Sequence, residues 1–139
     1  MPSLLSIAKS TRAFLALLLA EIDLHPGQDQ LLDRLDPNSP VSVSMLADQL
    51  FVRPSTVSKM LDRLIEKGLV ARTANSRDAR RTMVQLTPLG EKAQSSIREL
   101  WRRLENDLVS SLPADDVEAL DRSLARTDEL LTRKLRRLR

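Results

Sequence analysis

Residues 53–66 combine short hydroxyl side chains with basic side chains at helical spacing. Such groups donate hydrogen bonds to phosphate oxygens and to the edges of bases, which is the chemistry of nucleic-acid binding. Arginine can bond guanine through two hydrogen bonds, so Arg63 is a candidate for base contact, with an ion pair to Asp62 or Glu66 as the alternative. The candidate donors of this stretch are Arg53, Ser55, Thr56, Ser58, Lys59 and Arg63.

A second charged group, ANSRDARR, occupies residues 74–81 between two short strand-like runs at 69–73 and 82–86. This pattern predicts a β-hairpin with a charged tip. Arg80 is the candidate for insertion into a minor groove, because narrow A·T-rich grooves attract arginine. Asp78 would hold that guanidinium through a bidentate salt bridge. Arg77 and Arg81 are expected to contact phosphates.

The elements that position these groups are a helix and the hairpin that follows it. Pro54 suits the first turn of a helix, and Gly68 suits a left-handed end. Apolar residues recur between them at three- and four-residue spacing, on the side opposite the donors. These are Val57, Met60, Leu61 and Leu64. Helix, strand, charged hairpin and strand in this order predict the DNA-reading half of a winged helix-turn-helix.

The distribution of charge agrees with a localised polyanion site. Residues 53–81 contain eight basic and three acidic residues, a local net charge of +5, whereas the whole chain carries only +3. Residues 1–52 carry −3. A basic patch on a neutral or acidic body favours contact with a polyanion. The alternative is a solvated charged face without a partner.

Length and composition exclude several other classes. A chain of 139 residues with 42% apolar residues and few strand signals predicts one mainly α domain. It contains no cysteine and one histidine, His25, and it has no glycine-rich phosphate loop, so we expect neither an enzyme nor a cofactor or metal site. The apolar run 13–20 is too short to span a membrane, and residues 21–24 are expected to continue its helix. We therefore expect a cytoplasmic protein without a membrane partner.

The remaining chain is predicted to be helical. Residues 3–24 form a long helix whose second half is apolar on nearly all sides, and a second copy of the chain would cover it. A central helix of a monomer is the alternative. Further helices are expected at 28–35, at 45–50 with Ser44 as its cap, at 91–112, and from Pro113 onward with Ser111 as its cap. A minimal strand is expected at 41–43, and the basic end RKLRRLR suits the negative pole of the last helix.

Several of these pieces together resemble the MarR family of bacterial winged-helix repressors. The matching residues are Leu46-Ala47, Ser55-Thr56-Val57-Ser58, Gly68-Leu69-Val70, Asp78 with Arg80, and Val84 to Gly90 in the run VQLTPLG. Two positions depart from the family pattern. Phe51 stands where the family often has glycine, and Arg53 stands where a serine or threonine usually caps the reading helix.

The resemblance implies a single winged-helix domain over residues 1–139, with dimerisation helices at 3–24 and 91–138 and the DNA-binding module at 28–87. It implies a homodimer on a pseudo-palindromic stretch of double-stranded DNA, and release by a small aromatic effector, as in many members. The expected function is sequence-specific transcription regulation, as a repressor. The alternative is a winged-helix module that binds an acidic protein.

Overall fold

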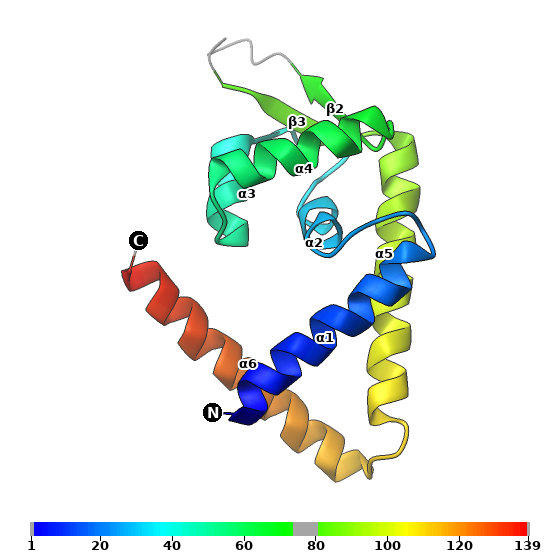
Figure 1. Ribbon diagram of the computed structural model, residues 1–139, viewed down its shortest axis with the longest axis vertical. Coiled ribbons are helices and arrows are strands. Elements are labelled where there is room, and N and C mark those ends of the chain that lie inside the picture. The colour runs from blue at the N-terminus through cyan, green and yellow to red at the C-terminus, as the bar shows by residue number, and fades with distance from the viewer. Residues whose placement is uncertain (1, 74–80, 139) are drawn as a thin grey trace. The chain divides into compact units, whose positions relative to one another are not determined.

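The computed structural model describes residues 2–73 and 81–138, and within them the chain is mainly helical with one small antiparallel sheet (Figure 1). This confirms the predicted mainly α winged-helix class. The chain divides into two compact units, Met1–Leu100 and Trp101–Arg139. The elements in order are α1 (Pro2–Ala20), α2 (Gln28–Asp33), β1 (Val41–Ser42), α3 (Val43–Leu50), α4 (Pro54–Glu66), β2 (Val70–Thr73), β3 (Met83–Leu86), α5 (Pro88–Val109) and α6 (Ala114–Arg137).

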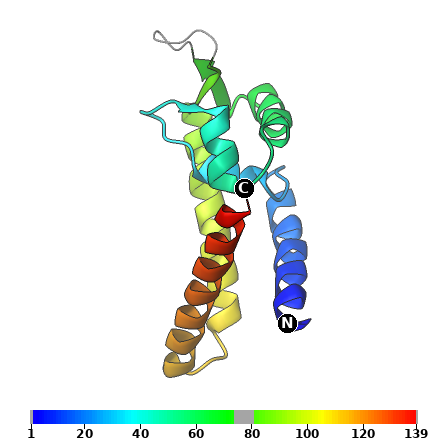
Figure 2. The same cartoon turned by 90° about the vertical axis from the view of Figure 1, so that its left-hand side faces the viewer.

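The three strands form one antiparallel sheet in the order β1-β3-β2. Val70 pairs with Leu86 and Thr73 with Met83, so β2 and β3 make the predicted hairpin, each starting one residue later than expected. Figures 1 and 2 show this hairpin beside α4. Because side chains alternate along a strand, Val70, Val84 and Leu86 share one face and are all buried.

The core of the first unit is built from one apolar stripe of each helix in the winged module. Its largest fully buried side chains are Leu31, Leu32, Leu46, Leu61 and Leu64, together with Leu19 from α1 and Ile97 from α5. Leu19 is the only residue of α1 that is buried within the chain. The winged module therefore has a complete core, whereas most of α1 has no cover from its own chain.

The end of α1 differs from the prediction. The helix ends at Ala20 rather than at residue 24. Glu21, Ile22 and Asp23 donate instead to carbonyls three residues back, and Asp23 takes a positive φ of 56°. Such tightening is common where a helix closes. The expectation that residues 21–24 continue the helix is thus wrong.

The full helix α1, Pro2–Ala20, is also longer than the apolar run 13–20. By length and composition alone it could cross a membrane, with a mean hydropathy of 1.4. The core helix of a water-soluble protein satisfies the same criteria. The shortness of the run 13–20 therefore does not by itself exclude a membrane span.

Two predicted helix caps are wrong for one reason. Ser42, not Ser44, caps α3, and its Oγ accepts a hydrogen bond from the backbone N–H of Met45 at 3.2 Å. The N-cap of α6 is Pro113, which makes no side-chain hydrogen bond, so Ser111 has no such role. A cap requires an extended backbone just before the first turn, and this position depends on where the chain bends. The helix α2 likewise ends at Asp33, two residues early.

The second unit contains the end of α5 and all of α6. No residue of α6 is buried, although leucines recur along it. Its charged side is held by ion pairs within the helix, from Arg122 to Glu118 and from Arg133 to Glu129. Trp101 is half-buried and begins this unit. Within the described chain, α6 thus has its own charged surface but no covered apolar face.

Candidate nucleic-acid interface

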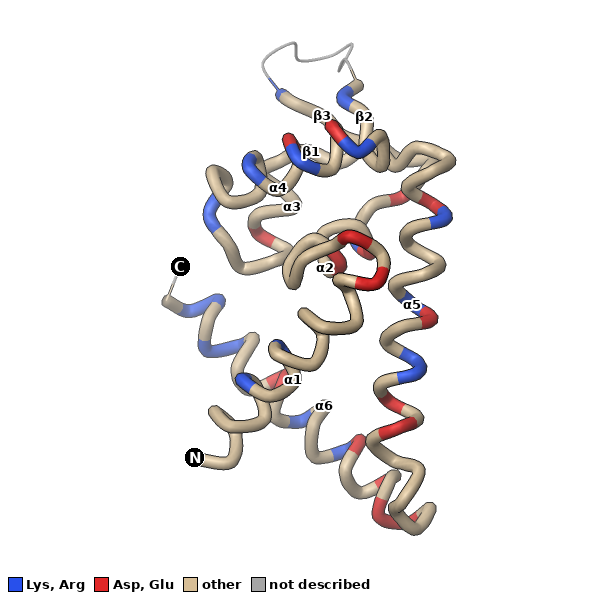
Figure 3. Tube along the Cα trace, turned by 45° about the vertical axis from the view of Figure 1, so that its right-hand side comes forward, with Lys and Arg blue, Asp and Glu red and all other residues tan. Residues whose placement is uncertain are grey.

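The helix α4 separates its two sides as the sequence predicts. Val57, Leu61 and Leu64 are buried, while the candidate donors on the other side are exposed. Those donors are Ser55, Thr56, Ser58, Lys59 and Arg63. Figure 3 shows basic positions along α4 and in the adjoining strand. The buried side fixes the helix on the core, so its donors are presented on a rigid element.

The start of α4 also suits an anion. Arg53 is extended, with φ −74° and ψ 145°, and its carbonyl accepts the N–H of Thr56 at 2.9 Å. No acidic residue lies in the first turn, and no side chain caps it. The positive end of the helix dipole is therefore uncompensated within the described chain, which favours a phosphate at this end. Pro54 occupies the first turn, as predicted.

Some basic residues of α4 and β2 form ion pairs with acidic side chains, and others do not. Lys67, the C-cap of α4, forms an ion pair with Asp23 at 3.0 Å. Arg72 of β2 forms an ion pair with Asp62 at 2.6 Å. Among the residues that the structure describes, three cations of this surface have no ion pair: Arg53, Lys59 and Arg63.

Arg63 therefore pairs with neither Asp62 nor Glu66, which was the alternative to a base contact. Its guanidinium is exposed and available to a ligand. Three further candidates, Arg77, Asp78 and Arg80, lie outside the described residues, so their roles stay predictions. Arg81 is exposed just before β3.

The turn before α4 keeps its shape although glycine is absent. Phe51 is the C-cap of α3 and adopts the left-handed conformation, with φ 55° and ψ 36°. A non-glycine residue there costs about 1–2 kcal/mol. Phe51 is half-buried, and Val52 donates to the carbonyl of Ala47 at 3.1 Å. The helix-turn-helix geometry thus accommodates the departure noted in the sequence.

At the other end of α4, a junction that was not predicted joins the turn that ends this helix to α5. Gly68 takes φ 73°, as predicted for a left-handed end. Its carbonyl accepts a hydrogen bond from the hydroxyl of Thr87, which also caps α5. The expected start of α5 at residue 91 is wrong, because Pro88 already occupies its first turn. The pair Thr87-Pro88 was the available signal, since a capping residue followed by proline marks a helix start.

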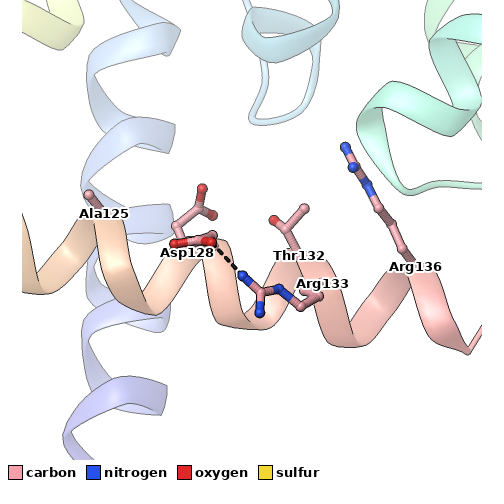
Figure 4. Close-up of a pocket in the computed structure, with 6 residues that line it drawn as sticks. Ala125, Asp128, Thr132, Arg133 and Arg136 are labelled. Carbon is pink, nitrogen blue, oxygen red and sulfur yellow. Dashed lines mark hydrogen bonds and ion pairs between the residues drawn. The ribbon is translucent and has the colours of Figure 1, made fainter.

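A shallow depression on α6 is not part of this interface. Figure 4 shows Ala125, Asp128, Thr132, Arg133 and Arg136 along it, with the ion pair of Arg133 drawn as a dashed line. All of its lining residues come from one helix, so it is an open surface. It offers no enclosure for a small molecule.

Comparison with known proteins identifies the fold and the family. The MarR family model matches residues 24–82. The multiple antibiotic resistance protein MarR of Escherichia coli is 30% identical over 104 residues, which cover 74% of this chain and 72% of MarR. A crystal structure of a mutant E. coli MarR complexed with operator DNA matches with a TM-score of 0.78 and 26% identity, covering 91% of each chain. The chain belongs to the MarR family.

A second relative is named an HTH-type transcriptional repressor. IacR of Pseudomonas putida is 30% identical over 107 residues, which cover 77% of this chain and 64% of IacR. The matches to two further relatives span only 43% and 52% of the length of those proteins.

Proposed function

We propose that this protein is a sequence-specific DNA-binding transcription regulator and acts as a repressor. The observation that carries the proposal is the free cationic side of α4, with Arg53, Lys59 and Arg63 exposed and unpaired within the described chain. Their neighbours are hydroxyl donors, and the opposite side of the helix is fixed in a core. A family member bound to operator DNA supports this assignment.

We further propose that it acts as a homodimer on a pseudo-palindromic site. Apolar side chains of α1 are widely exposed in the single chain, with Leu17 at 73% and Leu5 at 69%. Leu131 and Leu135 of α6 are exposed as well. Exposed apolar surface of this kind on two helices marks an interface, and a second copy is the natural cover. Sedimentation at micromolar concentration tests this; a folded monomer of 15.7 kDa would contradict it.

Three finer points belong to the same proposal. The protein works in the cytoplasm, has no enzymatic activity, and releases DNA when a small aromatic acid or phenol binds. The last point rests on the family resemblance. A set of such compounds, added to the protein–DNA complex at fixed salt, tests it. If none of these compounds released the DNA, the protein would have no effector of this class.

Footprinting on the DNA that flanks the protein's own gene tests the central proposal. A protected segment with two inverted half-sites about one helical turn apart is the expected result. The control is the double variant Lys59→Ala with Arg63→Ala, which should lose protection while keeping its helical circular-dichroism spectrum. Equal, weak affinity for every duplex would favour the alternative module that binds an acidic protein.

A further inference from the structure

Asp62 is an acidic residue on the exposed side of the helix that we assign to DNA. It lies one residue before Arg63 and three after Lys59, both of which are free cations of that side. A bare carboxylate there would be repelled by phosphate. Its Oδ1 instead accepts a hydrogen bond from Nη2 of Arg72 at 2.6 Å. The negative charge of Asp62 is therefore compensated from the neighbouring strand.

The position of Arg72 explains how it reaches the helix. Arg72 is opposite Val84 in the hairpin register, and residues opposite each other share a face of the sheet. Val70, two residues earlier, belongs to the same face and is buried. Arg72 thus lies on the side of β2 that faces α4, one residue before the strand ends at Thr73.

The pair contributes little to folding by itself. The side chains of Arg72 and Asp62 are 56% and 57% exposed, and exposed ion pairs are weak because solvent screens them. Its effect is geometric. Arg72 lies one residue before β2 ends, so its contact with the third turn of α4 restrains the direction of the β2–β3 hairpin relative to the helix.

We propose that Asp62 is a positioning residue, which acts through Arg72 to hold the wing hairpin at a fixed angle to α4. The helix and the hairpin can then contact one duplex at the same time. The ion pair therefore affects how well the protein distinguishes its operator from unrelated DNA, rather than its affinity for DNA in general. This inference rests on the proposed function, because it assigns a role within the same DNA-binding surface.

Glu66 provides a matched control. It lies one turn after Asp62 on α4, is exposed, and has no ion pair in the part of the chain that the structure describes. Asp62→Ala and Glu66→Ala therefore remove the same charge from the same helix. Simple electrostatics predicts that both variants bind every duplex more tightly. The positioning role predicts opposite signs for the two variants on the operator.

The expected result concerns the ratio of operator affinity to affinity for unrelated DNA, measured at one salt concentration. Asp62→Ala should lower this ratio on the order of tenfold, the scale of one lost specific contact, while Glu66→Ala leaves it unchanged. Arg72→Ala should lower it by a similar factor, and the double variant should be no worse than either single variant. Exchanging the charges, Asp62→Arg with Arg72→Asp, should restore it. Tighter operator binding by Asp62→Ala, or a folded exchange variant that restores nothing, would overturn the inference.

Hydrogen exchange of the free protein gives a reading that does not depend on DNA. Amide exchange in β2 and β3 should be faster in Asp62→Ala than in Glu66→Ala, whereas amide exchange in α2 should be the same in both variants. Equal exchange in the hairpin of both variants would overturn the positioning role. If the wild-type protein preferred no DNA sequence, the proposed function would fail, and the exchange measurement would still decide whether Asp62 orders the hairpin.

Discussion

The hydroxyl of Thr87 donates a hydrogen bond of 2.6 Å to the carbonyl oxygen of Gly68. The same oxygen atom of Thr87 accepts the N–H of Gly90 at 3.0 Å. One side chain therefore caps α5 and ties it to the left-handed turn that ends α4. Through this residue, the end of the reading helix and the start of α5 are held as one piece.

Gly90→Ala tests how closely these two segments approach. Helix propensity alone predicts a gain of up to about 1 kcal/mol in the free energy of unfolding. A Cβ at Gly90, however, would lie 2.0 Å from the backbone oxygen of Leu69, so one of the segments must move. We expect a loss of about 1–3 kcal/mol, the usual cost of overpacking. Urea unfolding at one protein concentration measures it, and any gain in stability would show that the junction yields easily.

Gln94→Leu tests the polar link between α5 and the end of α2. Nε2 of Gln94 is buried and donates to the carbonyls of Leu32 and Leu35, each at 2.9 Å. Leucine has a similar size but leaves both carbonyls without this donor, which should cost about 1–3 kcal/mol of unfolding free energy. Gln49→Leu, the same change at an exposed position of α3, is the control and should change stability by less than about 0.5 kcal/mol.

Lys59 and Arg63 should differ in what they recognise. Lys59→Ala should weaken binding to operator and unrelated DNA by similar factors and reduce the salt slope by about 0.9. Arg63→Ala should weaken operator binding by about 1–3 kcal/mol more than binding to unrelated DNA, if Arg63 bonds a base. Lys92→Ala removes an exposed charge from α5 and serves as the control. Equal losses on both DNAs for Arg63→Ala would make it a phosphate contact.

The wing residues Asp78 and Arg80 give a prediction that rests on the sequence alone. Arg80→Ala should weaken operator binding strongly, because it removes a groove-filling cation. Asp78→Ala should also weaken it, by about 1–3 kcal/mol, if Asp78 orients Arg80. The double variant should then be little worse than Arg80→Ala alone. Titrations of one operator with the wild type, the two single variants and the double variant measure these effects. Tighter binding by Asp78→Ala would refute the orienting role.

Local signals predicted α4 well, because Pro54 and Gly68 constrain the backbone at its two ends. The two strands of the hairpin were also predicted, with starts one residue too early, from short runs of strand-forming residues. Helix starts that depend on a bend in the chain were less accurate, as with Ser44 and with the start of α5. The candidate DNA-facing side of α4 could be predicted, since it follows from helical spacing.

Contacts between separate elements could not be predicted in the same way. The ion pair of Asp62 with Arg72 depends on how β2 packs beside α4, and the link from Gln94 to α2 crosses about sixty residues of chain. Neither partner carries a local signal for the other. The sequence therefore indicated which side chains could contact DNA, whereas only the structure shows which of the described side chains already form ion pairs within the chain.

Trp101 has a consequence for how this protein can be observed in solution. The chain has one tryptophan and no tyrosine, so its near-ultraviolet emission arises from a single side chain. That side chain is half-buried in α5, at the boundary between the two compact units. The emission wavelength of the unlabelled protein is thus a local reporter of the surroundings of Trp101. A change in this emission on adding DNA or a small molecule would report a change around this one residue of α5.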